Sequence, residues 1–475
     1  MKNVVLIVLD TVRKDYFDKY ASRIKNKSNL SFEQHRGASS WSVPSHTSIF
    51  TGELPSEHGA HSESFGANFS FCDILERNSL VQTFNNLGYN TFGLSANIYV
   101  NSKFGFGDPF DKFTDYSIGS HSMESLFTDA LSIHDIKGDS RYEKILNYLI
   151  ELPTTDKRVK SLMNSAWIPT SRLFHKLPLP ELVDDGGEKI TSHAKQVMNQ
   201  SDEPYFMFIN YMDAHTPHRN LIQYDQELHD VPNTWHSNEF GKWELIRDQI
   251  PDEYAENYRQ IYSASIEYLD RLVSDIIDTA DEDTIVVVTS DHGHNLGFED
   301  DDYQFHHTNS LTEGITHIPL EIVNSPVEGM VNDYYSQTQL FELIMELATE
   351  PTPKIPIDSG PTLSESIGLL ATASKPKVVD LSEEEFNYWN RMIRAAYIDD
   401  DKYVWDTQSV VEKYSLDKSK PCTQSQESKI QDSSCDYDSL FSTPITEYKD
   451  RYSSKNTDAD FDENVKSNLE DLGYI

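Results

Sequence analysis

The sequence predicts an α/β fold built on a largely parallel sheet with helices on both faces. Three runs of strand length, residues 4–9, 205–211 and 284–289, are apolar almost throughout. Each is followed by polar residues that could act in catalysis or bind a metal ion. Such runs are typical of strands buried on both faces, as in parallel sheets. Residues 261–276 carry apolar side chains at helical spacing and predict a helix with one face on the sheet. Because ligands bind at the carboxyl ends of strands in such sheets, we expect one shared site there.

The chain is strongly acidic. Its 475 residues include 78 acidic and 40 basic side chains, which gives a formal net charge of −38. This charge argues against nucleic acid as a partner, because nucleic-acid binders present basic faces. It also repels anionic substrates, so a metal ion or a helix terminus must attract them locally. With 11% aromatic residues the chain is not expected to be disordered, and we expect an acidic coat that resembles proteins of salt-loving archaea.

The cysteines and the hydropathy favour a cytoplasmic protein. Cys72, Cys422 and Cys435 do not form a disulfide framework; the alternatives are a bridge between the last two or unrelated thiols. The N-terminal apolar run is too short for a secretory signal and leads directly into Asp10. No run is long enough to span a bilayer. We therefore expect a cytoplasmic location without a membrane span, whereas the oligomeric state cannot be derived from the sequence.

The length predicts one large domain and one smaller domain. The large domain is expected at residues 1–345, with a helical insertion at about 112–185 that covers or flanks the site. Residues 346–475 are expected to form a smaller α+β domain. Within it, we predict a hairpin over 395–405, a flexible polar loop at about 415–437 and a short terminal helix that ends at Gly473.

Ser42 is the candidate nucleophile. It lies in the segment Ser-Trp-Ser-Val-Pro-Ser-His-Thr-Ser-Ile-Phe-Thr-Gly at residues 40–52. Pro44 fits the first turn of a helix that begins at Ser42, because the N–H that proline lacks would have no partner there. The remaining N–H groups of that turn form a seat for a tetrahedral oxyanion such as sulfate or phosphate. His46, on the same helix, is a candidate catalytic residue, with capping or packing as the alternative.

Metal ligands are predicted after two of the strands. Asp10 follows the first strand, and Asp291 with His292 follows the strand at 284–289. Together with the Ser42 hydroxyl they predict a site for one divalent cation. The cation would neutralise an anionic substrate and lower the pKa of the nucleophile, while the helix N-terminus takes up charge on the transferred group. Oxygen ligands suit Ca²⁺ or Mg²⁺, whereas His292 permits Mn²⁺ or Zn²⁺.

Further histidines are candidates for proton transfer. His215 and His218 belong to a loop that Pro217 stiffens, where a histidine can protonate a leaving group or bind an anionic oxygen. The alternative is a surface loop. His306 and His307 form another cluster, in which we expect one ring to be solvated and take His307 as the catalytic candidate.

These segments together resemble the sulfatase family of the alkaline phosphatase superfamily. The segments are the strand that leads into Asp10, the Ser42 signature, and the stretches Ser-Asp-His-Gly-His-Asn-Leu-Gly at 290–297 and Leu-Thr-Glu-Gly-Ile-Thr-His-Ile-Pro-Leu at 311–320. The resemblance covers about residues 1–345. It implies an alkaline-phosphatase-like sandwich with a large mixed, mostly parallel sheet, and one metal ion, Ca²⁺ above all. It also implies that Ser42 can be matured to formylglycine.

Several positions depart from the family pattern. Thr11 stands where a second aspartate usually follows Asp10, and His46 stands where an arginine is usual, which removes a bidentate anion contact. His292 stands where many sulfatases have asparagine. The basic residues expected near 95 and 308 are also absent. The residues at or near those positions, together with the second loop histidine, are the candidate substrate contacts: Asn97, Thr308 and His218.

The resemblance favours a sulfatase-like hydrolase that acts on small-molecule or glycan sulfate esters. Ser42, or formylglycine derived from it, attacks sulfur to form a covalent intermediate, and His215 assists the leaving oxygen. The set of two aspartates, a hydroxyl and a histidine also resembles phosphodiesterases and phosphoryl transferases of the same superfamily, which use unmodified serine or threonine. A third hypothesis is a binding homologue without turnover, against which the intact metal ligands argue.

Overall fold

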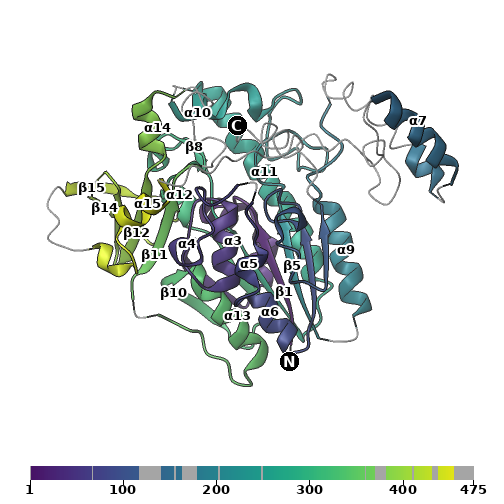
Figure 1. Cartoon of the computed structure of the whole chain (residues 1–475), viewed down its shortest axis with the longest axis horizontal. Coiled ribbons are helices and arrows are strands. Elements are labelled where there is room, and N and C mark those ends of the chain that lie inside the picture. Colours follow the sequence, from purple (N-terminus) through teal and green to yellow (C-terminus); the bar gives the residue numbers. More distant parts are fainter. Residues whose placement is uncertain are drawn as a thin grey trace.

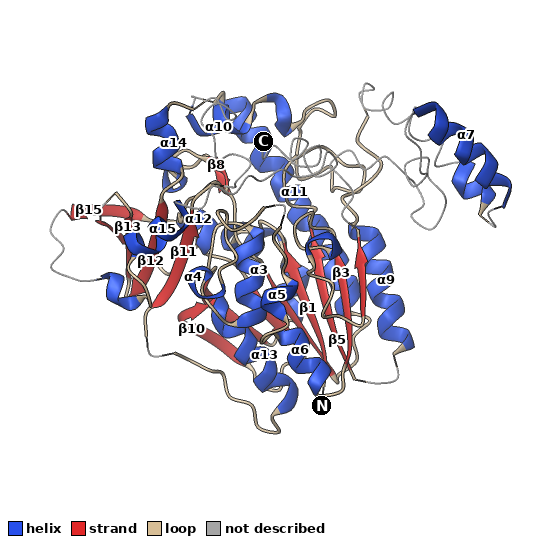
Figure 2. Ribbon diagram, viewed as in Figure 1, coloured by secondary structure: helices blue, strands red, loops and turns tan. Residues whose placement is uncertain are grey.

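The computed structural model places the strands in two main sheets, with helices around the larger one (Figures 1 and 2). The structure describes residues 2–66, 68–116, 141–154, 157–162, 179–201, 204–247, 250–358, 360–369, 381–408, 411–430 and 437–453. None of the helices in these ranges is both long and apolar enough to cross a membrane.

The larger sheet is mixed and mostly parallel, as expected. Over the described residues it has eight strands in the order β10-β2-β9-β6-β1-β5-β3-β4. Strand β1 pairs in parallel with β5 and β6, and β3 pairs in parallel with β5 and β4. Only β9 runs antiparallel to its neighbours within this described sheet. The bounds are β1 (Asn3–Leu9), β2 (Leu30–Arg36), β3 (Asn90–Ser95), β4 (Lys112–Asp115), β5 (Tyr205–Tyr211), β6 (Thr284–Thr289), β9 (Leu320–Val323) and β10 (Gly329–Ser336).

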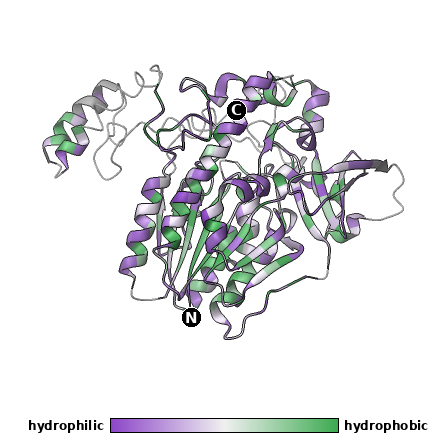
Figure 3. Cartoon of the chain, turned by 180° about the vertical axis from the view of Figure 1, so that it is seen from behind, coloured by the Kyte–Doolittle hydropathy of each residue, from purple (hydrophilic) through white to green (hydrophobic). Residues whose placement is uncertain are grey.

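Helices cover both faces of this sheet, and β1 fills both of the resulting cores. Its even-numbered residues Val4, Leu6 and Val8 pack with one group of helices, and its odd-numbered residues pack with the other. This alternation explains a run that is apolar at every position, and Figure 3 shows the strands as hydrophobic along their length. On one face lie α3 (Ser42–Thr51), α4 (Pro55–His58), α5 (Cys72–Leu75), α6 (Leu80–Asn86) and α13 (Leu340–Thr349); on the other lie α1 (Lys14–Tyr20), α2 (Ser22–Lys27), α9 (Gly187–Gln200) and α11 (Asp252–Ile277).

The predicted helix over 261–276 lies within α11, where it buries the expected residues. Shorter elements lie at the carboxyl end of the sheet. They are α10 (Lys242–Arg247), β7 (Asn295–Leu296), β8 (Phe305–His306) and α12 (Glu313–Thr316). Strands β7 and β8 pair with each other as a small antiparallel ribbon.

The second sheet is antiparallel throughout and confirms the predicted hairpin. Its strands are β11 (Thr362–Ile367), β12 (Met392–Ile398), β13 (Asp401–Asp406), β14 (Val411–Ser415) and β15 (Ser425–Ile430), with α15 (Ile445–Ser453) packed on one face. Helix α14 (Glu383–Trp389) precedes β12. The flexible loop predicted at 415–437 is wrong in part, because residues 425–430 form the edge strand β15. Residues 425–428 are exposed, so backbone pairing and not an apolar pattern holds this strand. The terminal helix predicted to end at Gly473 lies outside the described residues.

The first residues of the helical insertion predicted at about 112–185 belong to the large sheet. Residues 112–115 form β4, a partly exposed edge strand that pairs with β3, and its polar composition hides it in the sequence. Helix α7 (Arg141–Glu151) lies at the periphery of the molecule, apart from the site (Figure 1). Cys72 and Cys422 are free thiols, the latter buried, which agrees with unrelated thiols. Cys435 lies outside the described residues.

A buried ionic cluster joins the two sheets. Glu313 at the start of α12 contacts Arg36 at the end of β2 (Oε2–Nη2, 3.0 Å) and Lys402 on β13 (Oε1–Nζ, 3.1 Å). All three side chains are almost fully buried. Burial alone would raise the pKa of Glu313, but Arg36 and then Lys402 lower it to about 2. Glu313 is therefore ionised in the folded protein and balances two buried cations.

Replacing Glu313 with glutamine is expected to lower the free energy of unfolding by about 3–5 kcal/mol, because two buried cations lose their counter-ion. Urea unfolding at neutral pH measures this loss. The folded pKa lies below the ordinary value of 4.5, so the stabilisation is present above pH 4.5 and is lost as the pH falls toward 2. The deficit of E313Q should therefore shrink over that window. The control E447Q removes a surface carboxylate that is 58% exposed and paired with Arg451, and it should change stability by at most ~1 kcal/mol.

Candidate active site

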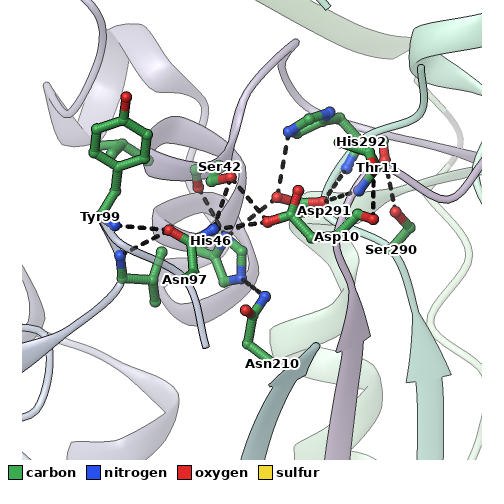
Figure 4. A network of polar contacts seen from close by, with 12 residues as sticks. Asp10, Thr11, Ser42, His46, Asn97, Tyr99, Asn210, Ser290, Asp291 and His292 are labelled. Atoms are coloured by element: carbon green, nitrogen blue, oxygen red, sulfur yellow. Dashed lines mark hydrogen bonds and ion pairs between the residues drawn. The ribbon is translucent and has the colours of Figure 1, made fainter. Parts of the chain in front are cut away.

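The polar residues that follow the parallel strands meet at one edge of the large sheet. Asp10 follows β1, Asp291 follows β6 after one residue, and Asn97 follows β3 after one residue. Strands β6, β1, β5 and β3 are neighbours in this order and run the same way, which brings these side chains together (Figure 4). Asp213, after β5, turns elsewhere: its Oδ1 accepts the N–H of Asp185 (3.2 Å). The side chains that follow β1, β6 and β3 thus meet at the carboxyl ends as expected, whereas a functional site there stays a prediction.

Ser42 lies at the first residue of α3, as predicted. Its Oγ donates a hydrogen bond to Oδ2 of Asp10 (3.1 Å) and accepts one from Nδ2 of Asn97 (3.0 Å). Nδ2 of Asn97 also donates to Oδ2 of Asp10 (2.7 Å). Oδ1 of Asn97 accepts the N–H groups of Tyr99 and Val100. Asn97 was expected to contact substrate. In the structure both ends of the Asn97 amide are hydrogen-bonded within the protein, next to the Ser42 hydroxyl, and the predicted substrate contact stays a prediction.

Asp10, Asp291 and His292 form a candidate metal site. They offer ligand atoms that all lie within 4.8 Å of one another, and all three side chains are fully buried. Oδ1 of Asp10, Oδ2 of Asp291 and Nε2 of His292 have no hydrogen-bond partner among the described residues. Buried polar atoms normally have partners, since leaving them without one destabilises the fold. A divalent cation among the three atoms would satisfy them all, so these residues fit a metal ion.

Hydrogen bonds to the protein orient these candidate ligands. Nδ1 of His292 donates to the carbonyl of Gly293 (2.9 Å), which leaves Nε2 as the ligand atom. Nε2 lies 3.3 Å from Oδ2 of Asp291. The other oxygen of Asp291 accepts the N–H groups of His292 (2.8 Å) and Thr11 (3.2 Å). Each ligand thus turns one polar atom to the protein and the other to the site.

The pKa values of the two carboxyl groups of the site are shifted in opposite directions. Burial, followed by the charge of Asp291, raises the pKa of Asp10 well above its usual range. Burial would also raise the pKa of Asp291, but His292, His46 and two backbone N–H groups lower it below its usual range. Of the two carboxyls, Asp10 is therefore the one that takes up a proton more readily, and Asp291 is the one that ionises more readily. A divalent cation would allow both carboxylates to ionise.

Thr11 shapes this site through its backbone. Its φ of 63° lies in the left-handed region, which a β-branched residue rarely adopts. Its Oγ1 donates to the carbonyl of Asp10 (2.7 Å), and its own carbonyl accepts the hydroxyl of Tyr262 (2.6 Å). These bonds hold a conformation that costs about 1–3 kcal/mol and aims the Thr11 N–H at Asp291. Where the family pattern has a second aspartate, this chain supplies a backbone donor.

His46 lies on α3, one turn after Ser42, and its ring is hydrogen-bonded to the Ser42 carbonyl and not to the Ser42 hydroxyl. Its Nδ1 donates to the carbonyl of Ser42 (2.9 Å) and lies 3.6 Å from Oδ2 of Asp291. Its Nε2 accepts from Nδ2 of Asn210 (3.2 Å), and the edges of Phe106 and Phe208 pack nearby. Burial lowers the pKa of His46, so the ring is neutral. The ring bonds the Ser42 carbonyl and lies near Asp291, so a catalytic role for His46 stays a prediction.

Asn210 was not singled out from the sequence. It is a lone amide within the apolar run 205–211. This single polar residue in an apolar run was the sequence feature that could have indicated a role for it. Buried amides in strands need partners. In the structure its Nδ2 finds one in His46 (Figure 4).

His215 and His307 meet next to the metal ligands. Nδ1 of His215 donates to the carbonyl of Thr216 (2.6 Å), and Nδ1 of His307 donates to that of Ser40 (3.1 Å). Their Nε2 atoms face each other at 3.4 Å. A hydrogen bond between these atoms requires one additional proton, so the pair can hold and release a proton at this position. Burial lowers the pKa of His215 to about 4 and that of His307 well below its usual range.

The remaining predicted residues are divided between a pocket and the core. His307 and Thr308 line a small pocket, together with Trp41. His218 does not line it: the ring is buried and packs edge-on against Tyr258, with centroids 4.6 Å apart. The predicted substrate contact at His218 is therefore not supported, because aromatic rings enclose it. His306 is half-buried and is the more exposed of its pair.

The second sheet holds the loop that precedes Ser42. Ser39 Oγ donates to the carbonyl of Glu365 on β11 (2.7 Å), and the N–H of Glu365 donates to the carbonyl of Ala38 (2.8 Å). The hydroxyls of Ser40 and Ser366 bond at 2.8 Å. No role for the smaller domain at this site could be predicted from the sequence, because pairing between distant segments leaves no local pattern. The structure shows that β11 fixes the approach to Ser42.

A family model described as Sulfatase matches residues 2–350. The chain belongs to the sulfatase family. This confirms the family that the residues around Asp10, Ser42 and Asp291 resemble, and it identifies the protein as a sulfatase-family hydrolase. The similarity to proteins of salt-loving archaea stays a prediction.

Individual relatives of this sulfatase-family chain are distant. Iduronate 2-sulfatase of Mus musculus is 28% identical over 130 residues, which cover 21% of this chain and 23% of that protein. The match thus spans about a quarter of that relative's length. Among solved structures, a 2-O GAG sulfatase superposes with a TM-score of 0.56 at 13% identity, covering 87% of this chain and 85% of that one. The phosphonate monoester hydrolase of Agrobacterium radiobacter gives 0.55 at 13%, covering 87% and 89%. At these identities the structures show the shared fold alone.

Proposed function

We propose that this protein hydrolyses sulfate esters of small molecules or glycans, with Ser42, or formylglycine derived from it, as the nucleophile. The observation that carries the proposal is the position of the Ser42 hydroxyl. It lies at the N-terminus of α3 and is hydrogen-bonded to Asp10, one of three buried residues that fit a metal ion. A nucleophile, an anion seat and a cation site thus occupy one point of the fold.

Asp10, Asp291 and His292, with the Ser42 oxygen, would hold one divalent ion, which supplies Lewis-acid stabilisation of the ester and favours ionisation of the nucleophile. Asp10 accepts the hydrogen bond of the Ser42 hydroxyl, and Asn97 fixes the Oγ atom from the other side. The N–H groups of the first turn of α3 face the oxygens of the transferred group. These contacts orient one lone pair of Oγ toward the sulfur atom.

In the proposed reaction, a bond forms between Oγ and sulfur while the bond between sulfur and the alcohol oxygen breaks. The Oγ proton passes to Oδ2 of Asp10, which accepts its hydrogen bond at 3.1 Å. The alcohol oxygen takes its proton from the His215–His307 pair, whose Nε2 atoms are 3.4 Å apart. The product of this step is a covalent sulfate on residue 42, which water then releases. An anionic ester beside the pair favours its protonated state, against the burial that lowers both pKa values.

A phosphodiesterase or phosphoryl transferase that uses unmodified Ser42 is the second candidate. The observation that favours it is His292, whose Nε2 atom faces the candidate metal site. A nitrogen ligand suits Zn²⁺ or Mn²⁺ better than Ca²⁺. The structural likeness to a phosphonate monoester hydrolase agrees with this candidate at the level of the fold. The three ligands argue against a binding homologue without turnover, because binding alone does not require them.

Peptide mass spectrometry over residues 37–52, combined with activity assays, tests the proposal. We expect formylglycine at position 42 when the protein is produced in a host that matures serine-type sulfatases, together with turnover of an aryl sulfate such as 4-nitrophenyl sulfate. Unmodified serine with turnover of bis(4-nitrophenyl) phosphate and no turnover of the sulfate would overturn it in favour of the second candidate. Absence of turnover on both esters, in protein loaded with each divalent ion in turn, would favour the binding homologue.

A further inference from the structure

Residues 141–154 and 157–162 form a helical hairpin at the periphery of the molecule. Its first arm is α7 with the short helix η2 (Leu152–Thr154), and its second arm is a helical segment at 158–162. The hydroxyl of Tyr148 on α7 donates to the carbonyl of Ser161 (2.5 Å), and both residues are buried. This contact joins the two arms. Figure 1 shows α7 apart from both sheets.

The helical hairpin belongs to the segment between β4 and α9, and both ends of this segment lie at the carboxyl edge of the large sheet. Strand β4 runs parallel to β3, so its last residue, Asp115, lies at the edge that also holds Asp10 and Asn97. At the other end, the N–H of Asp185 donates to Oδ1 of Asp213, which follows β5 (3.2 Å). Figure 1 shows α7 at the same end of the molecule as α10. The hairpin is thus on the side of the molecule that carries the proposed reaction centre.

Large apolar side chains of the helical hairpin are exposed. Leu149 and Ile150 on α7 are 57% and 63% exposed, and Val159 and Leu162 on the second arm are 71% and 54% exposed. They are four of the twelve exposed large apolar side chains in the described part of the chain, of which the hairpin is only 20 residues. Single exposed apolar side chains are ordinary on a protein surface, but a concentration of them marks a binding surface.

The charge of the helical hairpin is opposite in sign to that of the whole chain. Its 20 residues include five basic and two acidic side chains, a net charge of +3, whereas the chain carries −38. The sum counts both signs, so ion pairs within the hairpin leave it unchanged. Exposed aliphatic side chains combined with a net positive charge are typical of helices that lie on the surface of an anionic bilayer.

We propose that the helical hairpin binds the surface of an anionic lipid bilayer through its exposed aliphatic side chains and its net positive charge. With 11 residues, α7 is shorter than the roughly 20 residues needed to cross the hydrocarbon core, so it lies in the plane of the interface. Protein bound in this way has the carboxyl edge of its large sheet on the side of the bilayer. The proposal does not depend on the ester that is cleaved, because none of the residues around Ser42 takes part in it.

A lipid surface fits these features better than a second copy of this chain. Two copies would bring together two bodies that each carry a net charge of −38. A bilayer that contacts the peripheral hairpin need not approach the acidic body, whose charge is screened over about 8 Å at physiological ionic strength. The four exposed side chains are aliphatic, and a bilayer accepts aliphatic side chains without a pocket of complementary shape.

Cosedimentation of the full chain with lipid vesicles tests the inference. The wild-type protein should bind vesicles of phosphatidylcholine with about 30% phosphatidylglycerol at least about tenfold more tightly than vesicles of phosphatidylcholine alone, as expected for a net positive charge at an anionic surface. The double substitution Leu149→Gln/Ile150→Gln should weaken binding to the anionic vesicles at least about tenfold, because two aliphatic side chains no longer enter the interface. The control Leu87→Gln/Met330→Gln removes two exposed apolar side chains at the amino edge of the sheet, 41% and 61% exposed, and should bind like the wild type.

A second variant separates the binding surface from the folding of α7. Val159→Gln/Leu162→Gln changes the other arm of the hairpin and should weaken binding to a similar extent, and circular dichroism should show unchanged helix content in both variants. Equal binding of the wild type and L149Q/I150Q, or no binding of the wild type at about 1 mM anionic lipid, would overturn the inference. Sedimentation velocity provides the remaining outcome: a wild-type dimer that L149Q/I150Q lacks, without binding to vesicles, would assign the hairpin to a second copy and reject the lipid surface.

Discussion

Replacing Ser42 with alanine is expected to abolish ester hydrolysis, with kcat at least about 10³-fold lower, because the covalent route loses its only nucleophilic atom. The size of the effect follows from the structure: the Oγ atom is the point at which Asp10, Asn97 and the N-terminus of α3 converge. Initial rates on the best ester found for the wild type measure it. The substitution removes one buried oxygen, so folding should be retained, which circular dichroism verifies.

Ser45→Ala is the matched control for this substitution. Ser45 lies one turn further along α3, is fully buried, and its Oγ has no hydrogen-bond partner among the described residues. Its loss should change kcat by less than about threefold, the scale of a kcal/mol or less. If S42A kept the full rate on every ester tested, the covalent mechanism would be wrong for both the sulfatase and the phosphoesterase hypothesis.

Replacing Asp10 with asparagine is expected to have opposite effects on function and on stability. Without a cation, Asp10 is a buried carboxyl whose pKa is raised by burial and by the charge of Asp291. At neutral pH this raised pKa destabilises the metal-free folded protein. Asparagine removes that penalty, so metal-free D10N should be more stable than metal-free wild type by about 1–3 kcal/mol. The same change removes a metal ligand and should abolish metal-dependent stabilisation and activity.

Urea unfolding in the presence of a chelator measures this difference in the free energy of unfolding. The way the difference changes with pH follows from the direction of the Asp10 pKa shift. The folded pKa of Asp10 lies above the ordinary value of 3.8, so the penalty grows as the pH rises from 3.8 through the folded pKa and is absent below 3.8. The advantage of D10N should follow the same course. Metal ions must displace the proton of Asp10, so metal affinity of the wild type should fall as the pH falls. The control Asp278→Asn changes an exposed carboxylate and should show neither effect.

The parts of the fold that the sequence predicts are those with a local pattern. Strands β1, β5 and β6 are apolar at nearly every position, and α11 has helical periodicity, so each could be placed without tertiary information. The edge strands β4 and β15 could not, because partly or fully exposed strands depend on pairing with a neighbour and tolerate polar residues on both faces.

The same distinction applies to the site. Asp10, Asp291 and His292 follow predicted strands, and the rule for ligand sites in parallel sheets brings them together. The roles of His46 and Asn97 depend on which atoms lie beside them, and neighbours distant in sequence decide this.

The central claim is that Asp10, Asp291 and His292 hold one divalent cation next to Ser42. Its most direct test is the metal content of chelator-treated protein after equilibration with a divalent ion and removal of the excess, measured by mass spectrometry of the ion for Ca²⁺, Mg²⁺, Mn²⁺ and Zn²⁺ in turn. We expect one bound ion per chain for at least one of these metals in the wild type, and none in D10N or His292→Ala. Equal metal content in all three proteins, or full ester turnover by metal-free wild type, would contradict it.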